Sequence, residues 1–471
     1  MPLQPTSAIV IGGSITGLLS ARVLSDYYDS VTVIERDSLP NDAEYRNGTP
    51  QAHHLHTLLA EGQELLKKFF PNIEQDFEEY GAPYLRWGMD TATRLSTGWI
   101  DRFDTGIRSH VLSRVTLEWI IRQRVYAIPN VTFMTQQQVN HLVASADQST
   151  ITGVHITSRK DQSEQNLTAD LIVDASGRGS KTPKWLQDLG YAAPQETIIN
   201  SYLGYATRWY LLPEDASYSW TTILIQTIPK QGLNRGAGVF IVEGNRLVVT
   251  LAGANKDYPP TDDEEKFLDF AKSLASPIVY DIIKDLTPIS PIYGYRRTEN
   301  QFRHYEKLAR MPQGFIVLGD AACGFNPIYG QGMTTAAIEA VELDQLLQQT
   351  DVRHLGDFSH QFQKQVAKAV NGAWLMATSE DLRYPETEGP TPSIIDRATH
   401  RYMDMMLEVM PHDPILCTAF IKTMNLSTHP TSLFHPKYVF RVLQHKIIDK
   451  HEQAIEELPI HLISHPLSLE D

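Results

Sequence analysis

Glycines near the N-terminus stand where the phosphates of a ligand could be held. Gly12, Gly13 and Gly17 follow the apolar run 7–11 and precede a segment with helical spacing of apolar residues. Such a turn offers close backbone approach and unpaired N–H donors, and the dipole of the following helix favours an anion. Ser14 replaces the middle glycine of the usual G-x-G-x-x-G pattern and leaves less room there. We predict a diphosphate site at Gly12, Gly13, Ser14 and Gly17; a glycine turn without a ligand is the alternative.

An acid ends the second apolar run. Glu35 closes the run 30–35 and lies 18 residues after Gly17, so the whole segment has the dimensions of a βαβ unit. An acid at this strand end accepts hydrogen bonds from both ribose hydroxyls of an adenosine and repels a 2′-phosphate. Glu35 therefore favours FAD or NAD over NADP, and we place the next residue, Arg36, in the same site.

A further glycine-rich segment lies far downstream. Gly319 and Asp320 end an apolar run, and a loop leads from there to a helical pattern near Thr334. A nicotinamide dehydrogenase needs no such segment, so its presence favours FAD over NAD. The Asp320 carboxylate can hold ribityl hydroxyls, and N–H groups at the helix start can face the pyrimidine edge of a reduced flavin. A loop kept for close packing is the alternative. The predicted reactive end comprises Pro327, Gly330, Gly332 and Met333.

Three motifs in this order resemble those of a known family. VIGGSITG with Glu35, VDASGRGS, and LGDAACGFNPIYGQGM are similar to the FAD motifs of group A flavoprotein monooxygenases, the p-hydroxybenzoate hydroxylase type. More narrowly, RNGTPQAHHLH at 46–56, DASGRGS at 174–180 and FNPIYGQGM at 325–333 resemble the polyene epoxidases of polyether pathways such as those for lasalocid and monensin. The similarity extends over roughly residues 5 to 385.

The resemblance implies an α/β fold and further cofactor-binding residues. Arg114 in LSRVTLEW would bind the pyrophosphate, with a surface salt-bridge arginine as the alternative, and Arg46 and Asp174 join the predicted FAD site. Two residues separate Asp174 from Gly177, where the family usually has Asp-Gly. The expected electron donor is NADPH or NADH, either binding directly or acting through an external flavin reductase.

The strands predicted from the sequence are of two kinds. Short buried runs that end in an acid or glycine predict a parallel, doubly wound (Rossmann-like, glutathione-reductase type) sheet at 7–11, 30–35, 171–173 and 315–318. Stretches rich in aromatic and β-branched residues predict an antiparallel sheet at 201–212, 218–228 and 239–251. From about Thr334 the pattern is helical.

The expected domains follow from these segments. A discontinuous FAD-binding domain would use residues 1–75, 101–190 and 290–350. A substrate domain would use 76–100 and 191–289, and a C-terminal helical cap 351–471.

Substrate residues are expected where the two sheets meet. His53, His54 and His56 lack further ligands at metal-binding spacing, so no metal site is predicted; His54 is expected near the flavin, with a polar loop as the alternative. Three aromatic residues of the antiparallel block would line an apolar trough: Tyr202, Tyr205 and Trp209. A methionine-rich helix would either continue this trough or form an ordinary core: Met403, Met405, Met406 and Met410.

Composition excludes other function classes. Among 471 residues, 41 Lys and Arg stand against 56 Asp and Glu, a net charge of −15 that argues against binding nucleic acid. Two cysteines form no disulfide framework, which indicates a reducing compartment. No apolar run reaches the ~18–20 residues of a membrane span, so a cytoplasmic protein is expected.

The predicted activity is FAD-dependent monooxygenation through a flavin C4a-hydroperoxide. O₂ would supply one oxygen atom to a small apolar polyene, terpenoid or aromatic substrate, and alkene epoxidation is preferred because no acid and base pair for phenol activation is evident. Aromatic hydroxylation, halogenation, polyprenyl reduction and flavin binding without turnover are the alternatives. A halogenase would carry a Trp-x-Trp-x-x-Pro segment, which this sequence lacks.

Overall fold

A five-stranded parallel sheet forms the centre of the computed structural model, which describes residues 4–214, 216–227, 229 and 232–448. Its strands run in the order β20-β11-β1-β2-β7, and every neighbouring pair is parallel. The carboxyl ends align, because Ile11 is opposite both Ile34 and Asp174. The strands are β1 (Ser7–Ile11), β2 (Ser30–Ile34), β7 (Val131–Met134), β11 (Leu171–Asp174) and β20 (Phe315–Val317).

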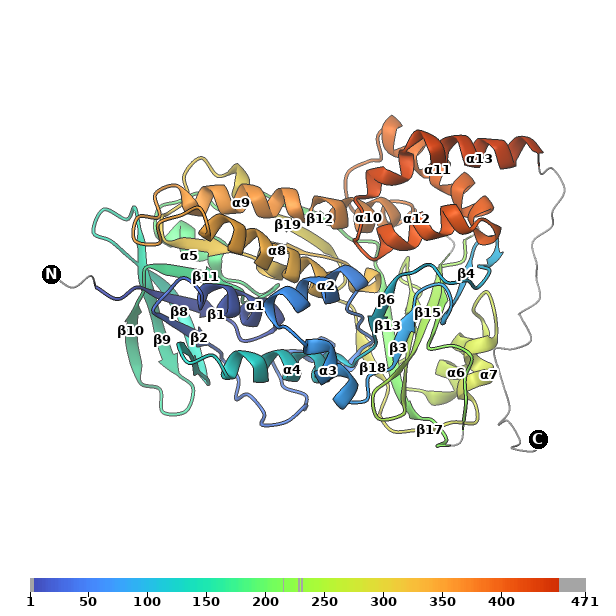
Figure 1. Ribbon diagram of the computed structural model, residues 1–471, viewed down its shortest axis with the longest axis horizontal. Helices are drawn as coiled ribbons and strands as arrows, with labels where there is room; N and C mark the ends of the chain where they lie inside the picture. The colour runs from blue at the N-terminus through green and yellow to red at the C-terminus, as the bar shows by residue number, and fades with distance from the viewer. Residues whose placement is uncertain (1–3, 215, 228, 230–231, 449–471) are drawn as a thin grey trace.

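Different layers cover the two faces of this sheet (Figure 1). Val10 packs with helices on one face, whereas Ile9 and Ile11 pack against a small antiparallel sheet and α5 on the other. Both faces are thus buried, which explains the uninterrupted apolar runs. The helices are α1 (Ile15–Leu24), α2 (Ala60–Phe69), α3 (Ile73–Glu79), α4 (Arg114–Tyr126), α5 (Thr182–Asp188), α8 (Gly332–Leu347) and α9 (Phe358–Ala369). The small sheet contains β8 (Gln137–Ala144), β9 (Ile151–Ser158) and β10 (Glu164–Thr168).

A second large sheet has eight strands and is antiparallel except where β14 pairs with β4. Along β13, Ala206 and Tyr210 face the core shared with α6 (Glu264–Lys272) and α7 (Ile278–Ile283). Because side chains alternate, Tyr205, Thr207 and Trp209 lie on the opposite face. The strands are β4 (Thr91–Leu95), β5 (Gly98–Trp99), β13 (Gly204–Leu211), β14 (Thr222–Ile225), β15 (Arg235–Val242), β16 (Arg246–Gly253), β17 (Thr287–Pro288) and β18 (Tyr293–Tyr295).

Short elements connect the large units. Two small sheets contain β12 (Glu196–Ile199), β19 (Asn300–Arg303) and β21 (Cys323–Gly324), and β3 (Tyr84–Arg86) with β6 (Arg108–His110). Single 3₁₀ turns are η1 (Pro50–His53), η3 (Tyr305–Lys307), η4 (Gly319–Ala321), η5 (Pro327–Tyr329), η6 (Met410–His412) and η7 (Pro430–Phe434).

The C-terminal helices pack beside the second sheet (Figure 1). Helix α11 begins with a capping box between Ser393 and Asp396. Met406 and Met410 are fully buried in the core of this helical unit rather than along a trough. The helices are α10 (Asn371–Asp381), α11 (Ile394–Val409), α12 (Pro414–Met424) and α13 (Pro436–Ile448). The predicted α/β class, with a parallel sheet, an antiparallel second sheet and C-terminal helices, is confirmed. Within the described ranges, no helix has the length and apolar character needed to cross a bilayer.

Candidate functional site

The turn between β1 and α1 is closed so tightly that glycine is required. Gly12 has φ +107°, and a Cβ there would lie 2.6 Å from the carbonyl oxygen of Ala175. A Cβ at Gly17 would lie 1.8 Å from the carbonyl oxygen of Gly12. Ser14 precedes α1 without capping it through its side chain, which leaves first-turn N–H groups available. The turn therefore has the shape and the donors of an anion site.

Glu35 is already engaged by its own surroundings. Its Oε2 accepts a hydrogen bond from the backbone N–H of Gly13 at 2.9 Å, and its Oε1 accepts one from the N–H of Asp37 at 3.0 Å. The Arg46 Nη1 atom lies 3.3 Å from Glu35 Oε2 and 3.1 Å from Asp37 Oδ2. Glu35, the residue predicted to bind the ribose, thus also joins the glycine turn to the loop that carries Arg46.

Arg114 and Arg46 meet on one buried carboxylate. Glu118 accepts a hydrogen bond from Arg114 Nη1 at 2.7 Å and one from Arg46 Nε at 3.0 Å. Arg114 also donates through Nη2 to Ser14 Oγ at 2.8 Å, so it reaches the glycine turn. Burial opposes ionisation of Glu118, yet Arg114 and Arg46 outweigh it and hold the pKa of this carboxyl below its ordinary value. Arg114 is therefore a buried network residue, not a surface salt-bridge arginine.

The three glycine-rich motifs converge in space. A Cβ at Gly12 would collide with Ala175 of the middle motif, and a Cβ at Gly319 would lie 2.7 Å from Thr16 of the first. Arg178, also in the middle motif, has its Nε 3.6 Å from Asp320 Oδ2 and donates to the carbonyl of Phe325. Residues 12–17, 174–180 and 319–333 thus form one continuous site.

Asp174 serves its own turn. Its Oδ1 accepts a hydrogen bond from the N–H of Ser176 at 2.9 Å. Its Oδ2 accepts two more from the hydroxyls of Ser180 and Thr182, each at 2.5 Å. Asp174 is fully buried, so both oxygens are occupied by its own segment. Asp174 therefore fixes the conformation of the middle motif from below its surface, and its carboxylate does not reach the surface that a ligand could contact.

The loop before α8 carries the predicted reactive end. It runs through η5, with Pro327 at its start, to Gly330, which has φ +67° and packs against Thr57. Gly332 opens α8 and is exposed, and Met333 is half-buried. Between Gly330 and Gly332, Gln331 is buried, and within the described residues neither its Oε1 nor its Nε2 has a hydrogen-bond partner. We call residues 325–333 the flavin loop.

His54 lies between the glycine motifs and the second sheet. Its Nδ1 is 2.9 Å from Thr207 Oγ1 on β13, and its ring meets Tyr205 and Tyr295 with centroids 4.8 and 5.5 Å away. Burial, together with His56, lowers the pKa of His54 to about 3, so the imidazole is neutral at physiological pH. We call His54, Tyr205, Thr207 and Tyr295 the aromatic box.

Of the two remaining predicted substrate residues, Trp209 lies on the same sheet face as the aromatic box and Tyr202 does not. Trp209 joins this face, because its indole N–H donates to the carbonyl of His53 at 2.8 Å. Tyr202 does not: its hydroxyl hydrogen-bonds Glu388, and Lys256 lies 4.3 Å from its ring centroid, away from the aromatic box. Tyr202 precedes β13 and lies outside the alternation that orients the strand.

The histidine triplet is separated by its contacts. His53 is stacked between Tyr45 and Tyr293 at centroid distances of 4.0 and 4.1 Å. His56 donates through Nδ1 to the carbonyl of His54 at 2.9 Å, and burial lowers the pKa of His56 to about 4. The three imidazole rings therefore make different contacts: His53 stacks on two tyrosines, His54 bonds to Thr207, and His56 bonds to the backbone.

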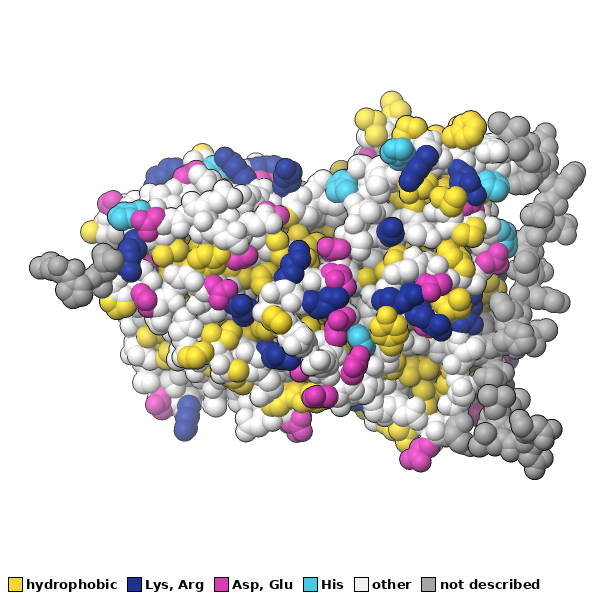
Figure 2. Space-filling model, viewed as in Figure 1, with side chains coloured by type: hydrophobic (Ala, Val, Ile, Leu, Met, Phe, Trp, Pro, Cys, Tyr) yellow, Lys and Arg dark blue, Asp and Glu magenta, His cyan; other side chains and the backbone are white. Residues whose placement is uncertain are grey.

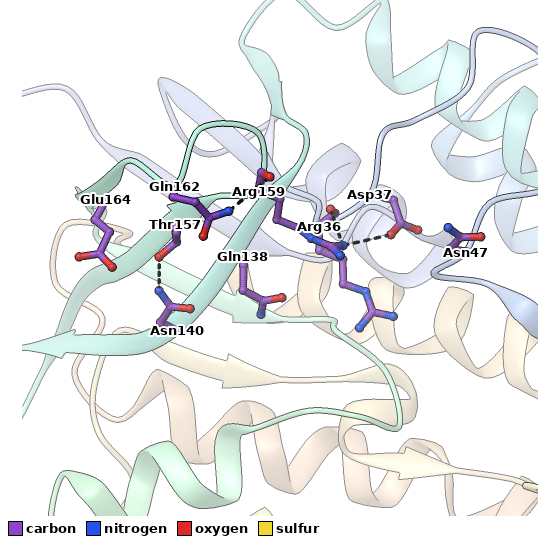
Figure 3. Close-up of a pocket in the computed structure, with 9 residues that line it drawn as sticks. All are labelled: Arg36, Asp37, Asn47, Gln138, Asn140, Thr157, Arg159, Gln162 and Glu164. Carbon is purple, nitrogen blue, oxygen red and sulfur yellow. Dashed lines mark hydrogen bonds and ion pairs between the residues drawn. The ribbon is translucent and has the colours of Figure 1, made fainter.

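A polar hollow of about 840 Å³ opens beyond the end of β2 (Figure 3). Arg36 and Asp37 line it from one side, and Gln138 and Arg159 from the three-stranded sheet. Arg159 donates to the carbonyl of Arg36 at 3.2 Å, and the Arg36 side chain is exposed. An adenosine held at Glu35 could extend toward this hollow.

Several site residues escaped the sequence analysis. Thr207 and Tyr295 could have been found by alternation, since Thr207 is two residues from Tyr205 and Tyr295 ends a Tyr-x-Tyr strand. Glu118 takes part of its role from Arg46, 72 residues away in the chain, and Gln331 is an isolated polar residue between two glycines. No local pattern marks them.

The parallel sheet, the converging glycine motifs and the helix start at the flavin loop define a flavoprotein with the fold of the group A monooxygenases. The chain belongs to the family described as FAD binding domain, which matches residues 5–351. Protein Rv3254 of Mycobacterium tuberculosis is 32% identical over 433 residues, covering 89% of each chain. The kynurenine 3-monooxygenase of Salinispora tropica is 25% identical over 358 residues, covering 72% of each. The solved flavin-dependent brominase Bmp2 aligns with a TM-score of 0.64 at 14% identity, covering 95% of this chain and 100% of that one.

The residues present fit FAD. Two helices, α1 and α8, begin without a capping side-chain hydrogen bond, and the three motifs bring both starts into one site. The Asp320 side chain is 42% exposed beside Arg178, so its carboxylate can accept hydrogen bonds from a ligand. The amide of Gln331, which has no hydrogen-bond partner among the residues that the structure describes, lies between the two glycines of the flavin loop. Family and fold together make this chain an FAD-dependent enzyme with monooxygenases and halogenases as relatives.

Proposed function

We propose that the chain is a monooxygenase that transfers one atom of O₂ to an apolar alkene and yields an epoxide. The second oxygen atom leaves as water, and NADPH or NADH supplies the two electrons, directly or through a flavin reductase. The observation that carries the proposal is the aromatic box: a buried site beside the flavin loop with no group that ionises near neutral pH.

The position of the box supports this choice. Thr57, three residues after His54, packs against Gly330, and Tyr295 lies near enough to Arg178 and Asp320 for their charges to act on it. Burial raises the pKa of Tyr205 well above its ordinary value, so its phenol stays protonated while the His54 imidazole stays neutral. A phenol substrate would need a base with a pKa near 7 to activate it, whereas an alkene needs none.

We assign the FAD-holding residues as follows. Gly12, Gly13, Ser14 and Gly17 would face the diphosphate together with Arg114, Glu35 would accept the ribose hydroxyls, and Arg36 would flank the adenosine. Asp320 would hold the ribityl chain, and backbone N–H groups at Gly330, Gly332 and Met333 the ring. When reduced and bound, FAD supplies the reaction with O₂ that makes an oxygen atom electrophilic.

The protein's own part is then to position the substrate and exclude water. Tyr205, Trp209 and Tyr295 offer an apolar wall, and the hydroxyl of Thr207 keeps the His54 ring in one orientation. Such a wall suits a polyene or terpenoid more than a polar substrate. In this proposal the parallel-sheet unit is the FAD-binding domain and the eight-stranded sheet is the substrate domain.

Aromatic hydroxylation is a second candidate, favoured by the similarity to a kynurenine 3-monooxygenase. Turnover under ¹⁸O₂ separates the two. A polyene or terpenoid alkene should gain one labelled oxygen as an epoxide, with O₂ and NAD(P)H consumed together. Efficient labelling of a phenol, with uncoupled peroxide release for every alkene tried, would instead make the chain a hydroxylase. Bromide-dependent product without label would indicate a halogenase, and turnover without O₂ uptake a reductase.

A matched pair of variants ties the activity to the box. Tyr205→Ala should lower kcat/KM for the alkene more than 10-fold, since it removes a buried ring of the aromatic box. Tyr126→Ala, on an exposed tyrosine at the end of α4, should leave kcat/KM unchanged. Equal effects of the two substitutions would contradict the assignment of the substrate to the aromatic box.

A further inference from the structure

A buried carboxylate from the C-terminal helices grips the start of the flavin loop. Asp381, the last residue of α10, has no exposed surface. Its Oδ1 accepts hydrogen bonds from the hydroxyl of Tyr329 at 2.8 Å and from Asn326 Nδ2 at 3.2 Å. Its Oδ2 accepts from Asn300 Nδ2 at 2.6 Å and again from Asn326 Nδ2 at 3.0 Å. One side chain thus joins α10, β19 and the flavin loop.

The donors are themselves fixed by the backbone. Asn300 Oδ1 accepts a hydrogen bond from the N–H of Asn326 at 2.7 Å, and Asn326 Oδ1 accepts one from the N–H of Ile328 at 3.3 Å. Asn300 and Asn326 are both fully buried. Every polar atom of the two amides that faces the cluster is therefore used, and the carboxylate completes it. Such closed networks hold one conformation strongly.

All of these donors are neutral, which is costly for a buried carboxylate. Burial raises the pKa of Asp381 to about 6, although its hydrogen bonds to Asn326, Tyr329 and Asn300 oppose the shift. A buried charge kept without a paired cation is expensive for the fold alone. In this cluster, Asn326 lies four residues before Gly330 and Tyr329 directly before it, where the loop turns toward the start of α8.

We infer that Asp381 is a positioning residue for the cofactor: through Asn326 and Tyr329 it fixes the flavin loop and so makes the FAD ring site depend on helix α10. This inference rests on the proposed placement of the ring at Gly330 to Met333. It does not depend on which substrate is oxidised.

The charged surroundings of Asp381 are mixed. On its own segment lie Glu380, Arg383 and the phenol of Tyr384; from α11, Asp404 faces Arg383 and Glu380, and from η5 comes Tyr329. Arg383 is held by Asp404 and Glu380 and forms no ion pair with Asp381 in the described part of the chain. Protonation near pH 6 therefore converts one acceptor of the cluster into a donor that faces other donors.

FAD binding to the full-length apoprotein tests the inference without any substrate. For the wild type, the FAD Kd from flavin fluorescence should rise several-fold between pH 7 and 5. Asp381→Asn should bind FAD about 10-fold more weakly at pH 8, lose this pH dependence and shift the visible flavin spectrum. A wild-type Kd, pH profile and spectrum in this variant would overturn the inference.

Two further variants separate positioning from general stability. Asp413→Asn removes another buried carboxylate of the C-terminal helices, one that pairs with Arg441 and His445 and not with the flavin loop. It should lower the melting temperature without changing the FAD Kd or its pH profile. Tyr329→Phe, which deletes one hydrogen bond and keeps the fold, should weaken FAD binding about 2–5-fold. An equal effect of Asp413→Asn on the Kd, or none of Tyr329→Phe, would show that Asp381 acts only on stability.

Discussion

The two ends of the candidate FAD site bury carboxylates in opposite surroundings. At the diphosphate end, Glu118 lies against Arg46 and Arg114, and its pKa is held below the ordinary value. At the ring end, the hydrogen-bond donors of Asp381 and Glu339 among the described residues are all neutral; Glu339 accepts a hydrogen bond from the N–H of Gly319. Burial raises the pKa of Glu339 to about 8.

A buried carboxylate thus has two different uses in this site: it positions arginines at one end and fixes the backbone at the other. Where an anionic ligand is expected, arginines are already arranged by carboxylates, so the site is set before the ligand arrives. Where the flavin ring is expected, amides and hydroxyls fix the backbone, and burial raises the pKa of Asp381 to about 6 and that of Glu339 to about 8. The ring end should therefore respond to pH in a range where the diphosphate end does not.

The largest effect is expected from Gly12→Ala, which acts on the diphosphate end alone. The new methyl group would collide with the Ala175 carbonyl in a backbone conformation that L-residues rarely adopt, so FAD affinity should fall more than 100-fold. Gly106→Ala is the control, because Gly106 lies outside the site with a φ of +78°, is exposed, and has no atom within 4 Å of the added carbon. Calorimetric FAD titration of both variants measures the contrast; equal affinities would refute the tight turn.

Glu118→Gln should destabilise the apoprotein by about 3–5 kcal/mol, because it leaves the buried Arg114 without its carboxylate partner and removes one of the three carboxylates around Arg46. Bound FAD should restore part of this loss, since its diphosphate would replace the missing negative charge. Glu64→Gln removes a surface partner of Lys67 and should cost less than about 1 kcal/mol. Denaturant unfolding with and without FAD gives both values, and an undiminished deficit in the holoprotein would count against a diphosphate at Arg114.

Asp320→Ala tests the ring end directly. Losing hydrogen bonds from a carboxylate to the ribityl chain costs about 1.5–3 kcal/mol, or roughly 10–100-fold in FAD affinity. Asp269→Ala, on an exposed residue of α6, provides the comparison and should bind FAD as the wild type does. Wild-type affinity in Asp320→Ala would remove that residue from the site.

The smallest expected effect is a change in how steeply the stability of the protein falls with rising pH. Because the folded-state pKa of Glu339 exceeds its unfolded value, the stability it contributes is present below about pH 4.5 and is lost as pH rises through about 8. Glu339→Gln should flatten this decline, which amounts to at most about 1.4 kcal/mol per pH unit. Glu265→Gln on α6 should keep it. Melting temperatures between pH 6 and 9 supply the test, and parallel curves for all three proteins would show that Glu339 does not titrate there.

Much of the parallel sheet could be predicted from the sequence. The run 7–11 coincides with β1, and those at 30–35, 171–173 and 315–318 differ from β2, β11 and β20 by one residue at an end. Strands buried on both faces are uninterrupted apolar runs between glycines and acids, so their signal is local. The run 239–251, predicted as part of an antiparallel sheet, covers the second half of β15 and most of β16.

Other parts depend on contacts that no local pattern records. Residues 76–100 were assigned to the substrate domain, but the parallel pairing of β4 with β14 leaves no mark in either segment. Asp381 lies 55 residues after Asn326 in the chain, yet the two share a buried hydrogen bond. Isolated polar residues on helices have no periodicity that identifies their partners. Roles such as those of Glu118 and Asp381 could be read only from the assembled fold.

The strand order of the parallel sheet also determines when the sheet can be completed during synthesis of the chain. Strand β20 pairs with the outer edge of β11, but residues 175–314, which include most of the second sheet, are made between them. At ~5–20 residues per second, the ribosome needs roughly 7–30 s to cover that interval. During this time the apolar edge of β11 lacks its neighbour, and unpaired edges of this kind are templates for wrong pairing. A nascent chain stalled before β20 is therefore the form of this protein in greatest need of a chaperone.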